Sequence, residues 1–174
     1  MLEGIDLSKY NGTAWSRDGL AFMFARATYG ATVDPRYSAH VRRARSTGMV
    51  VGAYCFGVGF ETAAAQAAAF LRASRGAELL ILDLETDPHK SMSNEQARDF
   101  IARVHASGHR IGLYHSRSRF PTTLGQDFNW VAQWGDRPPM GLPWAFWQYQ
   151  GHPLDRDRFN GDLAALHKLA GRPA

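Results

Sequence analysis

The sequence predicts an α/β fold, an irregular (β/α) barrel with about five parallel strands covered by helices and about three further short strands. Over the first two thirds of the chain, short apolar runs alternate with helical patterns, and buried strands of this kind need helices to cover them. Beyond residue 116, shorter aromatic segments follow without such helices. An open, doubly wound sheet is the alternative, although no glycine-rich nucleotide-binding loop follows any of these strands.

The first five predicted strands are apolar runs bounded by turn residues, over residues 4–7, 21–27, 49–56, 79–84 and 111–116. Four helices are predicted over residues 34–48, 62–75, 93–108 and 162–170. Asp34 followed by Pro35 indicates a cap and the start of the first helix. Ser93 and Gln96 have the spacing of a capping box at the start of the third.

Two aromatic segments, at residues 128–135 and 143–151, are separated only by a link rich in glycine and proline. Parallel neighbours need a long crossover, which is usually a helix, and no helical pattern lies between these segments. We therefore expect the later, shorter strands to pair in an antiparallel way.

The bulk properties indicate a single globular domain over residues 1–174, since a chain of 174 residues with 45% hydrophobic residues can bury one substantial core. The net charge of +4 favours an anionic partner. The basic residues are spread along the chain, so a nucleic-acid site is not expected. No apolar run approaches the length of about 20 residues that crosses a bilayer, so we expect no membrane insertion.

Two carboxylates interrupt the apolar run LLILDLET, at Asp83 and Glu85. Residues two apart in a strand point to the same side, so both acids face one direction and Leu82 and Leu84 face the other. They stand at the carboxyl end of their strand, where parallel barrels build active sites. Asp6, in GIDLS, occupies the same place on the first strand. The three acids are therefore expected to converge.

Several carboxyl groups around one cavity push their pKa values apart, so that one stays protonated near neutral pH while another is ionised. That arrangement suits acid-catalysed cleavage of an acetal. The alternative is structural, with Asp83 and Glu85 capping neighbouring loops or pairing with Arg26.

The chain has five Trp, six Tyr and ten Phe residues, and aromatic rings stack well on the apolar faces of sugars. Most of these rings must belong to the core, and Trp134 and Trp147 are the best candidates for ligand contact because they lie beside polar strand ends. The seven histidines lack a metal-binding spacing, so no metal site is predicted. Cys55 is expected to be a buried apolar residue.

Eight segments, in this order, carry a family resemblance: GIDLSKYNG, FARATYG, GAYCFG, LILDLET, GLYHS, WVAQWG, AFWQYQG and LDRDRFNGDL. Together they resemble glycoside hydrolase family 25, the N-acetylmuramidase lysozymes that include many phage endolysins. The resemblance implies an irregular β/α barrel that hydrolyses the β-1,4 bond from N-acetylmuramic acid to N-acetylglucosamine in peptidoglycan. It also implies that no metal or organic cofactor is used.

Carried over by position, the resemblance makes Glu85 the general acid and Asp83 the residue that orients or stabilises the reacting sugar. Asp6 would line the catalytic floor, and Asp155 would contact substrate or support the other acids. The wider set of candidate substrate-binding residues is Tyr54, Tyr114, Gln148, Trp134, Arg26 and Asp34.

The chain departs from the family pattern at three positions of the groove. The family commonly has Glu where Tyr29 stands, His where Cys55 stands and Asn where Asp157 stands. These departures leave the three acids in place and change the hydrogen bonding around them.

The expected function is therefore that of a monomeric muramidase whose partner is bacterial peptidoglycan. The N-terminus lacks the basic and apolar regions of a signal peptide, so we expect synthesis in the cytoplasm and action on the wall after release by phage lysis or another route. The alternatives are a glycan-binding barrel without turnover and a chitinase-like glycosidase.

Overall fold

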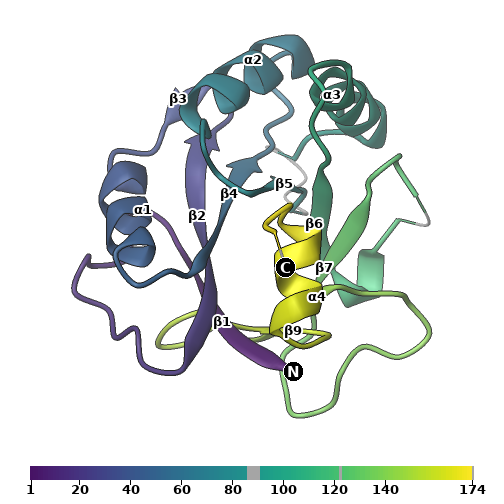
Figure 1. Cartoon of the computed structure of the whole chain (residues 1–174). Coiled ribbons are helices and arrows are strands. Elements are labelled where there is room, and N and C mark those ends of the chain that lie inside the picture. The colour runs from purple at the N-terminus through teal and green to yellow at the C-terminus, as the bar shows by residue number, and fades with distance from the viewer. Residues whose placement is uncertain (86–90, 122, 174) are drawn as a thin grey trace.

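The strands of the chain close into a barrel (Figure 1). The computed structural model describes residues 1–85, 91–121 and 123–173. Its strands are β1 (Leu2–Leu7), β2 (Leu20–Tyr29), β3 (Thr32–Val33), β4 (Val50–Phe56), β5 (Leu79–Asp83), β6 (Gly112–Ser116), β7 (Phe128–Ala132), β8 (Phe146–Gln150) and β9 (Arg156–Phe159). Their order is β1-β9-β8-β7-β6-β5-β4-β2-β3, and a further pairing of β1 with β2 closes the ring. The predicted α/β barrel is confirmed.

The barrel wall is almost entirely parallel. Each neighbouring pair is parallel from β1 through β2, β4, β5, β6 and β7 to β8. Among the described strands of the wall, β9 alone runs antiparallel to both its neighbours, and β3 adds an antiparallel edge outside β2.

The expectation of antiparallel pairing between the two aromatic segments is wrong. Strands β7 and β8 are parallel, with Trp130 opposite Phe146 and Ala132 opposite Gln148. A parallel crossover needs enough chain to return to the starting edge, and a helix is only its usual form. Here the irregular segment 133–145 makes the return, fixed by hydrogen bonds within itself such as that from Trp144 Nε1 to the Pro139 carbonyl oxygen.

The helices are α1 (Tyr37–Arg45), α2 (Ala63–Ala73), α3 (Asn94–Ala106) and α4 (Leu163–Leu169), with a short 3₁₀ turn, η1 (Arg117–Arg119). The predicted capping box of Ser93 and Gln96 is confirmed at α3. The predicted cap at Asp34 is wrong, because α1 begins at Tyr37 with Arg36 at its N-cap position. Among the described residues, no helix is long and apolar enough to cross a membrane.

The strands separate two hydrophobic cores, because alternate residues point to opposite sides of the wall. In β5, Leu80 and Leu82 face the outer core beneath α1, α2 and α3, and Leu79 and Ile81 face the barrel interior. Phenylalanine and tryptophan rings fill that interior, namely Phe22, Phe24, Phe128, Trp130, Phe146 and Phe159.

Glycines make room for these rings. A Cβ atom at Gly52 would lie 2.3 Å from Cδ1 of Phe24, and one at Gly4 would lie 2.3 Å from the ring of Phe22. The rings therefore occupy the space that side chains on the neighbouring strands would otherwise take.

Helix α4 closes the amino end of the barrel. Its Leu166 and the following Ala170 belong to the inner core, together with residues at the starts of the strands such as Leu79. Arg172, just beyond α4, donates hydrogen bonds to the carbonyl oxygens of Gly48 and Met49 and pairs with Glu78. Among the described residues, no helix covers the carboxyl end of the barrel in this way.

Candidate active site

A pocket of about 210 Å³ opens at the carboxyl end of the barrel strands. The residues that line it come from around the barrel wall: Asp6, Arg26, Tyr54, Phe56, Asp83, Glu85, Tyr114, Trp130, Trp134, Gln148 and Asp155. Every predicted site residue except Asp34 and Trp147 is in this set. The structure therefore brings together side chains that are spread from residue 6 to residue 155 of the sequence.

The alternation of side chains along the strands explains this convergence. Asp83 ends β5 on the inner side, Leu84 turns to the outer core, and Glu85 lines the pocket again. Asp6 takes the same inner place on β1, two residues after Gly4. Asp6 and Asp83 are buried, whereas Glu85 is exposed at the mouth.

Gln148 organises the floor of the pocket. Its Nε2 atom donates a hydrogen bond of 2.9 Å to Oδ2 of Asp6. Its Oε1 atom accepts hydrogen bonds from the Tyr114 hydroxyl at 3.0 Å and from Nε1 of Trp134 at 3.2 Å. These two partners donate to Oε1 and the Asp6 carboxyl group accepts from Nε2, so the hydrogen bonds fix which end of the Gln148 amide is the oxygen. The network fixes one oxygen of Asp6 while leaving the acid at the pocket surface.

Burial and mutual repulsion hold the pKa values of the inner acids high. Burial, followed by repulsion from Asp155 and Glu85, raises the pKa of Asp6 to about 8, although the hydrogen bond from Gln148 acts in the opposite direction. Burial also raises the pKa of Asp83 well above its usual value, followed by repulsion from Glu85 and Asp6, and Arg26 acts in the opposite direction. Oδ1 of Asp83 is buried without a hydrogen-bond partner among the described residues.

The two outer acids are shifted in the same direction. Partial loss of contact with water raises the pKa of Glu85. Burial, and then repulsion from Glu85, raises the pKa of Asp155 to about 6. A cluster in which every carboxyl group holds its proton more firmly than usual can supply a proton near neutral pH.

Arg26 and Asp34 form a buried ion pair beside the pocket. The distance from Nε of Arg26 to Oδ2 of Asp34 is 2.9 Å, and Asp34 also accepts hydrogen bonds from the backbone amides of Lys9 and Arg36. Asp34 therefore lies behind Arg26 and does not line the pocket. The arginine makes its ion pair with Asp34, so the alternative in which Asp83 and Glu85 pair with Arg26 finds no support.

The two tryptophans proposed for ligand contact have different places. Trp134 is 70% exposed at the rim and lies over Gly151, where an added Cβ would be 2.3 Å from its ring. Trp147 is fully buried, donates a hydrogen bond to the Gln133 carbonyl oxygen and is absent from the pocket lining. Tyr10 is a further exposed ring, with the Arg26 guanidinium 5.4 Å from its centre.

Sequence reasoning missed Phe56 and Trp130, which also line the pocket. The period of two could have found both, because Phe56 follows Tyr54 on β4 and Trp130 follows Phe128 on β7. Within the described residues, no group of three or more His, Cys, Asp or Glu side chains is arranged to hold a metal ion.

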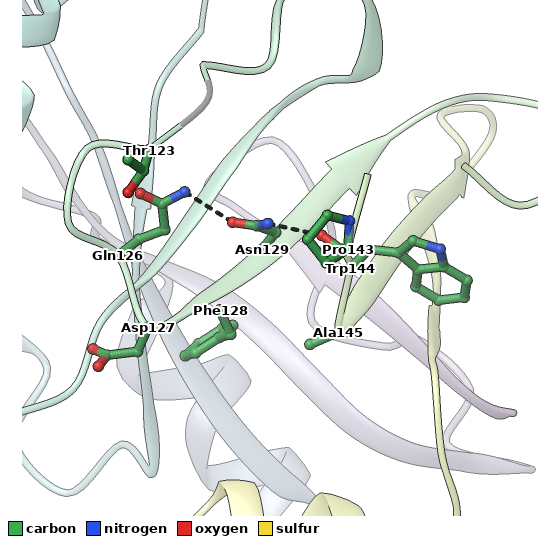
Figure 2. A pocket seen from close by; sticks show the side chains of 8 residues that line it. All are labelled: Thr123, Gln126, Asp127, Phe128, Asn129, Pro143, Trp144 and Ala145. Carbon is green, nitrogen blue, oxygen red and sulfur yellow. Dashed lines mark hydrogen bonds between the residues drawn. The ribbon is translucent and has the colours of Figure 1, made fainter. Parts of the chain in front are cut away.

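A second hollow lies at the other end of the barrel, where β7 and β8 begin (Figure 2). Figure 2 shows a hydrogen bond from Gln126 to Asn129 and another from Asn129 to the Pro143 carbonyl oxygen. The Asp127 side chain points away from these two hydrogen bonds. Asp127 is hydrogen-bonded to the backbone amide of Ile111 and to the His105 ring. These bonds hold the pKa of Asp127 below its usual value, although partial burial acts in the opposite direction. The polar groups satisfy one another, so this hollow lacks the unpaired acids of the first.

Comparison with known proteins agrees with this geometry. The chain matches the model of glycosyl hydrolases family 25 over residues 5–157. A bacterial lysozyme from Streptomyces coelicolor is 30% identical with a TM-score of 0.82, over 97% of this chain and 96% of that one. A family GH25 lysozyme from Aspergillus fumigatus is 25% identical with a TM-score of 0.82, over 97% and 98%. No curated protein sequence matches the chain. The extent of the family match shows that the chain belongs to glycosyl hydrolase family 25.

Proposed function

We propose that the protein is an N-acetylmuramidase that hydrolyses the β-1,4 bond from N-acetylmuramic acid to N-acetylglucosamine in peptidoglycan. Family membership makes it a glycoside hydrolase of the lysozyme type. The observation that carries the finer proposal is the convergence of Asp6, Asp83, Glu85 and Asp155 in one pocket that is open to solvent.

Glu85 is the general acid in this proposal. It stands at the mouth of the pocket, where a glycan strand can reach it, and its raised pKa keeps it protonated at a higher pH than a free glutamate. Its proton passes to the glycosidic oxygen as the bond from that oxygen to C1 of the muramic acid breaks. The glucosamine part of the strand then leaves with a neutral 4-hydroxyl group.

Asp83 orients the 2-acetamido group of the muramic acid and accepts a hydrogen bond from its N–H. The acetamido oxygen forms a bond to C1 as the glycosidic bond breaks, water then replaces it, and the proton of that water returns to Glu85. Burial keeps a proton on Asp83 in the free protein, and Arg26 favours the ionised form that this step needs once the substrate is bound. The first product is then the β-anomer, and an α-anomer would contradict this route.

Aromatic rings at the rim suit a carbohydrate. Trp134 is exposed on one side, and Tyr29 is stacked on Phe56 with their ring centres 5.0 Å apart. Flat apolar rings beside carboxyl and amide groups match sugar rings, which have apolar faces and polar edges. We propose that these rings hold the sugars on either side of the bond that is cleaved.

The test is to digest purified peptidoglycan and identify the new reducing-end sugar by reduction and mass spectrometry. Muramic acid at the new ends is the expected result. Glucosamine at the new ends would assign a different bond and favour a chitinase-like glycosidase. Binding to the wall without new reducing ends, by a protein shown to be folded, would favour a glycan-binding barrel.

A further inference from the structure

Asp157 is a buried carboxyl group that the proposed reaction does not use. It lies on β9, opposite Gly4 of β1 and Gln148 of β8, and none of its surface is exposed. Its Oδ1 atom accepts a hydrogen bond of 2.7 Å from Nε1 of Trp130. Its Oδ2 atom is buried and receives no donor from the described residues. A charged carboxylate with one bare oxygen in this place would be costly.

The carboxyl group beside that bare oxygen is Asp6. The two residues are diagonal neighbours on one face of the wall, since Asp6 lies two residues beyond Gly4, which pairs with Asp157 across β1 and β9. Because two carboxylates offer only acceptors, a hydrogen bond between these groups needs a proton on one of them. Asp6 already accepts the Nε2–H of Gln148, which favours its ionised form. The proton is therefore placed on Asp157, whose Oδ2 then has a partner.

No cation compensates a charge on Asp157 within the described part of the chain. The titratable groups that face it are Asp6, Asp155 and the Tyr114 hydroxyl, while Gln148 and Trp130 face it as neutral groups. The flanking Arg156 and Arg158 point to the outer side of the wall, where both act on Tyr149. Burial and the nearby Asp6 accordingly raise the pKa of Asp157 well above its usual value.

We propose that Asp157 keeps its proton at neutral pH and donates it as a hydrogen bond to an oxygen of the Asp6 carboxyl group, which makes Asp157 a positioning residue for the pocket floor. A neutral carboxylic acid held by burial can act as a donor in this way. Asp6 is then fixed from two sides, by the amide of Gln148 and by the acid of Asp157. The part of this proposal that concerns catalysis rests on the proposed function, whereas the part that concerns the proton does not.

The proton on Asp157 is tested by counting the protons that the protein releases when it unfolds. A native state that binds more protons than the unfolded chain loses stability as the pH rises, and the slope of that loss gives the number released. Between pH about 5 and 7 an unfolded aspartate is ionised. We expect the parent protein to release protons in this range and Asp157→Asn to release about one fewer. The exposed Asp18→Asn should release as many as the parent. No release by the parent, or an unchanged count in Asp157→Asn, would overturn the proposal.

The positioning role is measured by comparing two replacements in peptidoglycan lysis. Asparagine can still accept from Trp130 and donate to Asp6, whereas leucine has a similar volume and can do neither. We expect Asp157→Asn to keep at least tenfold more activity than Asp157→Leu, and to keep it to higher pH because an amide has no proton to lose. Equal losses in both variants, with normal folding, would contradict the positioning role. If the parent itself lyses no wall, the proposed function fails, and the proton count still stands as its own test.

Discussion

The two ends of the barrel interior are built from opposite kinds of side chain. At the amino end, Phe22, Phe128 and Phe159 pack under Leu166 of α4 and fill the interior. At the carboxyl end, Asp6 and Asp83 are buried beside one another with their pKa values held high, and the space is open.

The difference shows how one fold supports a costly site. Burial of the aromatic rings stabilises the barrel, and gathering like charges at the other end lowers that stability in return for reactivity. Substitutions at the carboxyl end should therefore lower mainly the lytic activity, and substitutions of the packed rings should lower mainly the free energy of unfolding.

The largest effect is expected at the carboxyl end for Glu85→Gln. The amide keeps the shape of the side chain and has no acidic proton, so lytic activity should fall about a thousandfold while the unfolding midpoint stays close to that of the parent. Turbidity loss of purified walls and urea unfolding measure the two quantities. The exposed Glu95→Gln on α3 is the matched control and should change neither. Lysis at the parent rate would assign the acid to another residue.

The counterpart in the aromatic interior of the barrel is Phe24→Ala. Phe24 is fully buried, with ring centres 4.7 Å from Trp130 and 4.8 Å from Phe146. Its removal should lower the free energy of unfolding by about 3–5 kcal/mol, measured by urea unfolding. Phe60→Ala, at a ring that is 64% exposed, should change it by less than about 0.5 kcal/mol. A loss below about 1 kcal/mol for Phe24→Ala would mean that the rings do not carry the stability of the barrel.

Asp83→Asn should move activity and stability in different directions. Lytic activity should fall about a hundredfold, because an amide cannot ionise when the substrate binds and so cannot supply the charge that orients the reacting sugar. The native protein holds a proton on Asp83 that the unfolded chain releases above pH about 4, so unfolding becomes easier as the pH rises toward the native pKa. The variant should show a shallower fall of stability with pH. A steeper fall would contradict the raised pKa of Asp83.

The smallest effect is expected in the pH profile of the unmodified protein. Glu85 works while it is protonated, so lytic activity should fall on the alkaline side as Glu85 ionises, and its raised pKa moves that fall to higher pH than for a free glutamate. Initial rates of wall lysis across the pH range, in buffers of constant ionic strength, measure the profile. An activity that rises steadily with pH would indicate a base in place of an acid.

Much of the carboxyl end could be predicted from local patterns. The period of two along 79–85 is enough to place Asp83 and Glu85 on one side, because a strand leaves each side chain only two directions. The same period places Trp130 with Phe128 on the inner side of β7. Family resemblance added Asp155, whose local sequence gives no sign of its partners.

The contacts that remained out of reach depend on how the barrel closes. The parallel pairing of β7 and β8 depends on the closure of the whole barrel. The segment between these strands has no helical pattern from which a crossover could be predicted. Asp157 reaches Asp6 only because β9 inserts beside β1, across nearly the full length of the chain. Asp34 has the sequence of a helix cap, yet its side chain is taken up by Arg26 and by two backbone amides.

The most direct test of the proposed roles of Glu85 and Asp83 is a crystal structure of the Glu85→Gln variant with a peptidoglycan fragment that spans the cleaved bond. We expect the glycosidic oxygen within about 3 Å of the residue 85 side chain and the 2-acetamido N–H against Asp83. A fragment bound with its glycosidic oxygen out of reach of residue 85, or bound only in the hollow at the amino end of the barrel, would contradict these roles.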